Sequence, residues 1–234
     1  MTGLVRKATL LAVCGLLTAG VAMAHVPDPA NSECPTGCIY VVGHNGTVGD
    51  RAGAFCVTVR DFNNVPIENS SVIIDFSNCD LQLCINQLDA GVIVDCVSQT
   101  VRKLTDVTGK ACFRIIGKAR PSLGCTNVGA NCVRIFADST PLCSVNAAVF
   151  DLVNDPAGNG LGAGDLSAWL SMFFCPGAPN PHRGDYICDG VLGAGDLSRW
   201  LTVFFGNYPT VLNTPGSTLN CPPPKDNNVG PKCQ

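Results

Sequence analysis

The sequence predicts a mainly β protein, an antiparallel β-sandwich followed by a small pair of α-helices. Residues 38–150 contain short apolar runs of period two, separated by Gly, Asn, Asp and Pro, which is the pattern of half-buried strands. Residues 151–207 contain two nearly identical segments with apolar residues at helical spacing. The chain also has 15 cysteines, which favours a fold stabilised by disulfides.

The first 24 residues have the features of a secretory signal peptide. Two basic residues precede an apolar run, and Ala22-Met23-Ala24 has the form of a cleavage site. We expect the mature chain to begin at His25, with residues 25–37 as a linker into the first strand. An alternative interpretation takes Leu11–Cys14 as a lipoprotein cleavage box. No later segment approaches the roughly 20 apolar residues of a membrane helix, so we expect a secreted protein, extracellular or at the cell surface, without a membrane span.

Charge and cysteine content narrow the functional classes. The signal peptide carries two basic residues and no acidic one, so its removal changes the formal charge from -3 to about -5. No basic stripe is present, so we expect neither nucleic acid nor an anionic membrane as a partner. Without Cys14, an even number of cysteines remains, which allows up to seven disulfides in an oxidising compartment. The cysteines lack the paired spacing with histidines that a zinc site requires.

Seven or eight strands are expected in the sandwich region. They are 39–42, 54–59, 72–76, 92–94, 100–104, 112–116, 132–137 and 144–150. In two of these runs, apolar residues alternate most clearly with other residues. Phe55, Val57, Val59, Phe113 and Ile115 are therefore expected to face the core, because alternate side chains of a strand point to opposite faces.

The same alternation bears on the disulfides. Cys56 and Cys112 fall between the core positions and should face outward. We therefore expect bridges within sheet faces and loops, for example between Cys79 and Cys84, rather than a bridge across the core. Connectivity itself cannot be deduced from sequence.

Two turn motifs lie in this region. One is D-x-x-x-x-P at Asp61–Pro66, at the end of a strand, and the other is T-D-x-x-G-K-A at Thr105–Ala111 in a later hairpin. These segments resemble the Ig-like repeats of bacterial surface adhesins of the invasin and intimin kind. The resemblance implies an Ig-like antiparallel β-sandwich over residues 38–150, a fold that serves adhesion, spacing and display alike.

The C-terminal part of the chain contains a duplication. Leu161–Phe174 and Leu192–Phe205 differ at only three positions. In each copy, apolar side chains follow the spacing of one helix face. They are Leu166, Trp169, Leu170, Phe173 and Phe174 in the first copy, and Leu197, Trp200, Leu201, Phe204 and Phe205 in the second. We expect two helices that bury these faces against each other, with both tryptophans in the core rather than in a platform for sugar rings.

Each predicted helix follows an acidic loop. Asp185, Asp189 and Asp196 occupy relative positions 1, 5 and 12 in the second copy, with Gly190 at position 6, which is the spacing of a calcium loop. The three carboxylates and the carbonyl of Val191 are expected to bind Ca2+, which prefers oxygen ligands. The candidate ligands of the first copy are Asp151, Asp155, Asn159 and Asp165, in a loop with three extra residues. Alternatively, both loops hold no ion and the two segments form a disulfide-supported helical hairpin.

The motif D-x-x-x-D-G-x-L-x-x-x-D-L of the second copy resembles that of dockerins, the duplicated calcium-loop modules that dock secreted bacterial proteins onto cohesin domains. The resemblance covers residues 151–207 and implies an extracellular protein partner, cohesin-like or another surface protein. Ile187 and Gly193 depart from the family at loop positions 3 and 9, where oxygen ligands are usual. Ala194 and Gly195 stand at positions 10 and 11, where dockerins of the cellulosome type carry a hydroxyl pair that touches the partner.

Catalytic constellations are not visible in the sequence. No GxSxG, HExxH or phosphate-cradling glycine loop is present, and the three histidines lie in Pro, Gly or Asn contexts typical of loops. We therefore expect no enzyme. One alternative is a copper site in which His25, as the new N-terminal residue, is joined by His44.

The resulting prediction is a monomeric, secreted, non-catalytic binding protein. Calcium would order the helices so that Ser198, Arg199 and Thr202 on a polar helix face contact the partner. A competing interpretation is a structural or adhesive cell-surface protein in which the helices are only a cap. A third, an accessory subunit of a polysaccharide-degrading assembly, follows from the dockerin resemblance alone.

Residues 208–234 form a Pro-rich tail that is expected to lack regular structure. The tail contains Cys221 and Cys233. We expect these to tie it to Cys175 or Cys188 in the helical unit, or to each other.

Overall fold

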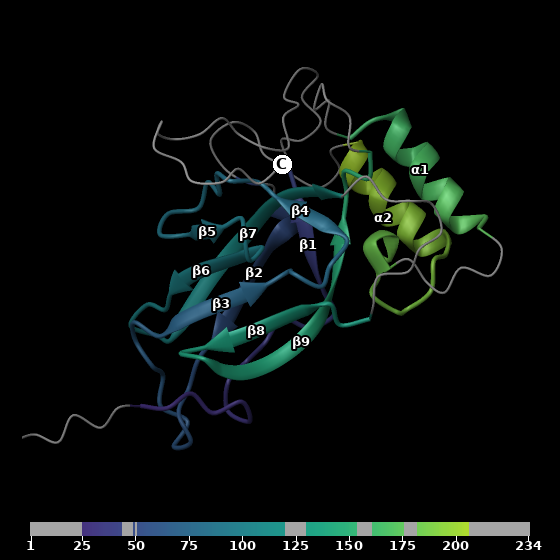
Figure 1. Cartoon of the computed structure of the whole chain (residues 1–234). Coiled ribbons are helices and arrows are strands. Elements are labelled where there is room, and N and C mark those ends of the chain that lie inside the picture. The colour runs from purple at the N-terminus through teal and green to yellow at the C-terminus, as the bar shows by residue number, and fades with distance from the viewer. Residues whose placement is uncertain are drawn as a thin grey trace, which may run out of the picture.

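The computed structural model describes residues 25–43, 49, 51–119, 130–153, 161–175 and 182–205 (Figure 1). Within these residues the strands are β1 (Cys38–Val42), β2 (Ala54–Thr58), β3 (Ser71–Asp75), β4 (Leu81–Leu83), β5 (Ile93–Asp95), β6 (Thr100–Leu104), β7 (Lys110–Ala119), β8 (Val133–Ala137) and β9 (Thr140–Val149). The helices are η1 (Arg51–Gly53), α1 (Ala163–Phe173), η2 (His182–Gly184) and α2 (Ala194–Phe204), of which η1 and η2 are 3-10 helices. The expected signal peptide and the expected tail lie outside the described residues.

The strands form one mixed sheet in the order β2-β7-β1-β9-β8-β3-β6-β5, with β4 paired to β7. Most neighbouring strands are antiparallel, but β1 is parallel to both β7 and β9. The prediction of a mainly β region followed by two helices is confirmed, whereas the prediction of a purely antiparallel sheet is wrong at β1. Because β7 and β9 run in the same direction, a strand between them must have the same relation to both. No helix among the described residues is long and apolar enough to cross a membrane.

A single core collects side chains from strands at both ends of this order. Val57 of β2 and Ile115 of β7 belong to the same buried cluster as Ile74 of β3 and Val101 of β6. Strands at opposite ends of the order can share one core only if the sheet folds over on itself. The inward orientation expected for Val57, Val59, Phe113 and Ile115 is confirmed, and Phe55 is partly buried against the same cluster.

The disulfides follow the predicted orientations only in part. The bonds that join described cysteines are Cys34–Cys143, Cys38–Cys188, Cys56–Cys112 and Cys79–Cys132. Exposed Cys56 and Cys112 bridge neighbouring strands on the outer face, as expected. The suggested Cys79–Cys84 bond is wrong, because Cys79 lies in the core and pairs with Cys132 there. Cys84, Cys96 and Cys175 are also disulfide-bonded, and this cysteine usage indicates an oxidising environment.

Both α-helices lie together beside β9 and β1 (Figure 1). Their buried side chains are Trp169 and Met172 in α1 and Trp200 and Val203 in α2, and these share a second core cluster with Phe150 and other residues at the ends of β1 and β9. The two helices bury apolar side chains in one shared cluster, as expected, but the sheet also contributes to this cluster, which was not expected. Because the sheet supplies part of the apolar surface, the buried face is rotated, and Phe173, Phe174 and Phe205 are 42%, 72% and 65% exposed.

Candidate metal centre

The second acidic loop brings three carboxylates together. Asp185 follows η2, Asp189 lies in the turn beyond it, and Asp196 lies in the first turn of α2. One carboxylate oxygen of each residue lies within 4.8 Å of the other two. Asp185 and Asp196 are buried while Asp189 is exposed, so the cluster is open to solvent on one side. This is the trio that the sequence spacing predicts.

Asp185 organises the loop through its own carboxylate. Its Oδ1 accepts the N–H groups of Cys188 at 2.6 Å and Asp189 at 3.2 Å, and its Oδ2 accepts that of Gly190 at 2.7 Å. Cys188 and Gly190 have φ angles of 65° and 85°, a backbone conformation that glycine adopts at little cost. Val191, which is 59% exposed, donates its N–H to Oδ1 of Asp189 at 2.9 Å. The loop therefore wraps around the first aspartate.

Asp196 connects this loop to the helix. Its Oδ2 accepts the N–H of Gly193, the N-cap residue of α2, at 2.8 Å. Its Oδ1 accepts the N–H of Ile187 at 2.8 Å. A carboxylate in the first turn of a helix also suits the helix dipole. One buried side chain thus fixes both the beginning of α2 and the preceding loop.

The first copy repeats this arrangement. Asp165 accepts the N–H of Gly162 at 2.8 Å, and those of Leu152 and Val153 at 2.7 Å and 2.9 Å. It also shares a side-chain hydrogen bond with Asp151, so the first and last predicted ligands of this loop lie together. The other two candidates, Asp155 and Asn159, lie outside the described residues. The duplication seen in the sequence therefore extends to individual hydrogen bonds.

In both loops, the surroundings of the aspartate in the first turn of the helix disfavour the charged form of its carboxyl group. Burial is the main cause that raises the pKa values of Asp165 and Asp196, and the nearby charge of Asp185 raises the pKa of Asp196 further. Among the described residues, no ion pair with a basic side chain involves Asp185, Asp189 or Asp196. Within the described part of the chain, the second loop therefore carries negative charge without a basic side chain paired to it, and its three carboxylates can hold a metal ion.

The two tryptophans link the copies reciprocally. Trp169 donates its Nε1–H to the carbonyl of Gly184 at 3.0 Å, and Trp200 donates to that of Phe150 at 3.3 Å. Gly184 and Phe150 immediately precede the first aspartates of the second and first loops. Each helix is therefore bonded to the start of the other copy's loop. Both indoles are 1% exposed, so the prediction that they are core residues is confirmed.

Loop position 3 has a packing role in both copies. A Cβ added at Gly195 would lie 2.1 Å from Cδ1 of Ile187, so this side chain rests directly on the first turn of α2. Val153 has the same relation to Gly164, where an added Cβ would lie 3.5 Å from its Cγ2. Sequence reasoning treats Ile187 only as a missing ligand. The structure shows that it covers a helix glycine instead.

The residues expected to contact a partner lie away from the buried side of α2. Ser198 is exposed and Arg199 and Thr202 are half-buried, whereas Trp200 and Val203 face the core. Thr202 donates its hydroxyl hydrogen bond to the carbonyl of Ser198 at 2.7 Å. Part of this face is therefore open to solvent.

Two features around the site escape sequence reasoning. Cys188, between Asp185 and Asp189, is bonded to Cys38 of β1 and so ties the loop to the sheet rather than to the tail. Tyr186 is completely buried, donates its hydroxyl to the carbonyl of Val149 at 2.9 Å, and accepts at its own carbonyl from the hydroxyl of Tyr40 at 2.6 Å. The only sequence signal for Tyr186 is its match to an apolar residue, Leu152, in the first copy.

The two described histidines have different settings, and His182 lies directly before the acidic loop, where its carbonyl accepts the N–H of Asp185 at 3.2 Å. His25 Nδ1 lies 2.6 Å from Oδ2 of Asp61, in a turn of the sheet. His182 is in η2, and His44 lies outside the described residues. The alternative copper site with His25 and His44 therefore stays a prediction.

Comparison with protein-family models, with curated proteins and with solved structures finds no match for this chain.

Proposed function

We propose that this is a secreted, non-catalytic binding protein that docks to an extracellular protein partner through a calcium-ordered, dockerin-like helical pair. The observation that carries the proposal is the cluster of Asp185, Asp189 and Asp196, which gathers three carboxylates within 4.8 Å and has no basic partner among the described residues. The reciprocal bonds of the two tryptophans support it, because they make the duplicated segments one unit.

Calcium is the ion that suits this donor set. All three side chains offer carboxylate oxygens, and the loop adds backbone carbonyls such as that of Val191, which is the ligand chemistry of a hard cation. A divalent ion would reduce the repulsion between Asp185 and Asp196. Because these residues also hold the loop and the start of α2 through backbone hydrogen bonds, the ion would stiffen the helix that carries the docking face.

The docking face proposed for the partner is the polar side of α2 around Ser198, Arg199 and Thr202. A cohesin-like or other extracellular surface protein would contact this side while Trp200 anchors the opposite side in the core. Arg199 replaces Ala168 of the otherwise similar first copy, so the two helices offer different surfaces. The second helix is therefore the better candidate for a specific contact.

The sheet would serve as the displayed or adhesive part, with an Ig-like sandwich architecture. The shared core of strands from both ends of the sheet supports a two-layer arrangement. The two turn motifs also adopt tight turns, in which Asp61 accepts the N–H groups of Asn63 and Val65, and Asp106 accepts that of Thr108. The parallel pairing of β1 is the point where this sheet departs from the expected pattern.

A calcium titration of the whole mature protein tests the proposal. We expect calcium to increase helicity or protect the amides of α2, and the pair of substitutions Asp189→Ala and Asp196→Ala to abolish this response. Asp106→Ala is the matched control, because Asp106 also accepts backbone hydrogen bonds but lies in a turn of the sheet. No response of the wild type at millimolar calcium, or an unchanged response of the double variant, would remove the metal from the proposal.

The docking face is tested separately. Ser198→Glu and Thr202→Glu place charge on the polar side of α2 without touching the core. In affinity purification from the extracellular fraction, these variants should lose a partner that the wild type retains in calcium and releases in chelator. Retention of the same partner by both variants would contradict the assignment of this face.

The hydrogen bonds within the second loop favour a second function, that of a structural or adhesive protein. The carboxylate oxygens of Asp185 and Asp196 already accept backbone N–H groups, so the loops are internally satisfied. This supports a structural or adhesive surface protein in which the helices only cap the sheet. In that case, calcium would leave α2 unchanged and partner contacts would map to the sheet.

A further inference from the structure

Strand β2 forms an edge of the sheet that is only partly covered. Its inner side pairs with β7. Among the described residues its outer side is paired only at Thr58, which exchanges N–H to C=O hydrogen bonds of 2.9 Å and 2.8 Å with Glu33. Residues 34–37 then leave the edge and lead into β1. Between these residues and the start of β2 lies a cavity of about 440 Å³.

The backbone groups that point toward this opening can be identified. Residue pairs in an antiparallel ladder alternate between hydrogen-bonded and non-hydrogen-bonded types. Because Thr58 directs its N–H and C=O outward, Cys56 and Ala54 direct theirs to the same side. The Cα atoms of Cys56 and Cys112 are 4.0 Å apart, which matches the close spacing of a non-hydrogen-bonded pair. The carbonyl of Cys112 accepts from Nζ of Lys103 at 2.9 Å and so points away from β2.

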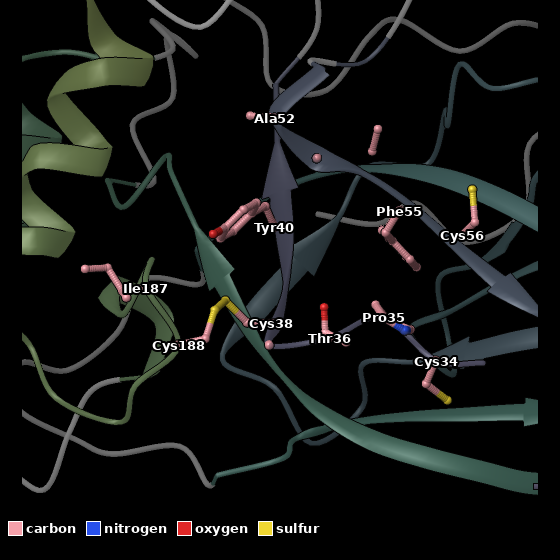
Figure 2. Close-up of a pocket in the computed structure, with 13 residues that line it drawn as sticks. Cys34, Pro35, Thr36, Cys38, Tyr40, Ala52, Phe55, Cys56, Ile187 and Cys188 are labelled. Atoms are coloured by element: carbon pink, nitrogen blue, oxygen red, sulfur yellow. A yellow bond between two sulfur atoms is a disulfide. The ribbon is translucent and has the colours of Figure 1, made fainter. Parts of the chain in front are cut away.

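Among the described residues that line it, the cavity beside this edge has aromatic walls and no charged side chain. Figure 2 shows Tyr40, Phe55 and Thr36 among the side chains that line it. Its lining comes from residues 34–38, Tyr40, residues 52–56, Ile187 and Cys188. The hydroxyl of Tyr40 is held by the carbonyl of Tyr186 at 2.6 Å, which fixes one wall. A charged group buried here would find no charged partner among these described residues, so the lining favours an uncharged side chain.

We propose that the open edge of β2 binds an extended peptide segment of a partner protein, which adds to the sheet beside Ala54–Cys56 and places an uncharged side chain in the cavity. Strand addition takes its affinity from backbone hydrogen bonds and its specificity from pockets for alternate side chains. The occupant follows from continuity, because the Glu33–Thr58 pair already begins this ladder and a further strand would extend it. The outward N–H and C=O groups of Ala54 and Cys56, for which the described residues offer no backbone partner, match an extended peptide backbone.

This contact is independent of the docking face proposed on α2. Of the described residues of the helical unit, Ile187 and Cys188 line the cavity, and both lie in the loop before α2. Loss of peptide binding with retained docking through α2, or the reverse, would therefore distinguish the two proposals.

Amide hydrogen exchange of the intact, oxidised mature protein tests the open edge first. We expect the N–H groups of Ala54 and Cys56 to exchange much faster than those of Phe55 and Val57, which face β7. Equal protection of all four amides would overturn the proposal, because another segment of this chain would then already cover the edge.

Selection from a displayed library of random octapeptides tests the binding itself. We expect the wild-type protein to enrich peptides with uncharged, β-branched or aromatic residues at alternate positions, and a synthetic copy of an enriched peptide to slow exchange at Ala54 and Cys56. Thr36→Arg, which places a bulky charge among the residues that line the cavity, should lower the affinity at least tenfold. Val97→Arg, at a 76% exposed position in the turn between β5 and β6, is the matched control and should bind normally.

A second variant separates the backbone contact from the cavity. Ala54→Pro removes an outward N–H while leaving the ladder to β7 intact, which an edge strand tolerates. We expect it to retain the fold, shown by unchanged protection of Val57, and to bind the selected peptide at least several-fold more weakly. The proposal is overturned if no peptide is enriched over the Thr36→Arg variant, or if bound peptide leaves the exchange of Ala54 and Cys56 unchanged.

Discussion

Aspartates accept backbone hydrogen bonds both in the turns of the sheet and in the loops of the helical unit, but the two regions treat their charge differently. Asp61 and Asp106 each hold a turn of the sheet through Oδ1. Asp165 and Asp196 hold the beginnings of the two helices through Oδ2. The local geometry is alike, so any difference in their chemistry comes from the surroundings.

The surroundings act in opposite directions on the pKa values. A side-chain hydrogen bond from His25 is the main cause that lowers the pKa of Asp61, and one from the Thr108 hydroxyl does the same for Asp106. In the helical unit, burial instead raises the pKa values of Asp165 and Asp196. The sheet turns therefore stabilise a carboxylate that is already ionised. The helical loops instead disfavour the charged form of these carboxylates, and a bound cation would offset this effect.

Removal of one carboxylate from each region should give the largest difference in the free energy of unfolding. Asp165→Ala leaves up to three N–H groups in buried surroundings without an acceptor, at a cost of about 1–3 kcal/mol for each donor that water cannot reach. Asp106→Ala exposes its donors to water and should cost less than about 1 kcal/mol. Free energies of unfolding from urea titrations in chelator would show this order. Similar losses of unfolding free energy in both variants would contradict the proposed difference between the two regions.

Substitution of a turn glycine should give a smaller difference in stability between the two regions, and here the larger loss is expected in the sheet. Gly109 in the sheet and Gly190 in the second loop have φ angles of 75° and 85°. A Cβ at Gly109 would lie 2.6 Å from the carbonyl oxygen of Val59, whereas one at Gly190 meets nothing within 4 Å. Gly190→Ala should therefore cost only the backbone strain of about 1–2 kcal/mol, and Gly109→Ala clearly more. Thermal unfolding of the two variants in chelator, compared at equal salt, checks the order.

The pH dependence of folding stability is the smallest expected effect, but Asp61 and Asp165 should change it in opposite directions. A carboxyl whose pKa is lowered in the native state, such as Asp61, adds stability above the ordinary value of 3.8 and loses it as the pH falls through the native pKa. A carboxyl whose pKa is raised, such as Asp165, adds stability below 3.8 and loses it as the pH rises through the native value. Asp61→Asn and Asp165→Asn should therefore change the pH profile of calcium-free stability in opposite directions. Profiles that shift in the same direction would contradict the assignment.

Sequence reasoning succeeded where the pattern is local. The period-two runs locate every strand except β4, which is only three residues long and too short to show alternation. The spacing of Asp185, Asp189 and Asp196 anticipates their cluster, because a loop of fixed length that ends in a helix brings its ends together. The burial of both tryptophans likewise follows from helical periodicity.

The sequence did not predict features that depend on packing between segments far apart in the chain. The buried face of each helix is decided by the ends of β1 and β9, so Met172 replaces Phe174 in the core of the first copy. Cysteine pairing depends on which strands become neighbours, so the bond between Cys79 and Cys132 has no sequence signal. The parallel pairing of β1 has the same origin, since it depends on the directions of two strands far along the chain.

The Cys38–Cys188 bond determines how the molecule would respond to mechanical tension. It closes a covalent loop with a sequence separation of 150, and this loop contains all the strands β1 to β9 of the described residues and the whole first copy of the repeat. If a partner holds α2 while the residues before Cys38 are pulled, the force passes from Cys38 to Cys188 and bypasses the polypeptide between them. The sheet would then be shielded from stretching, and only the short segments outside the loop could extend.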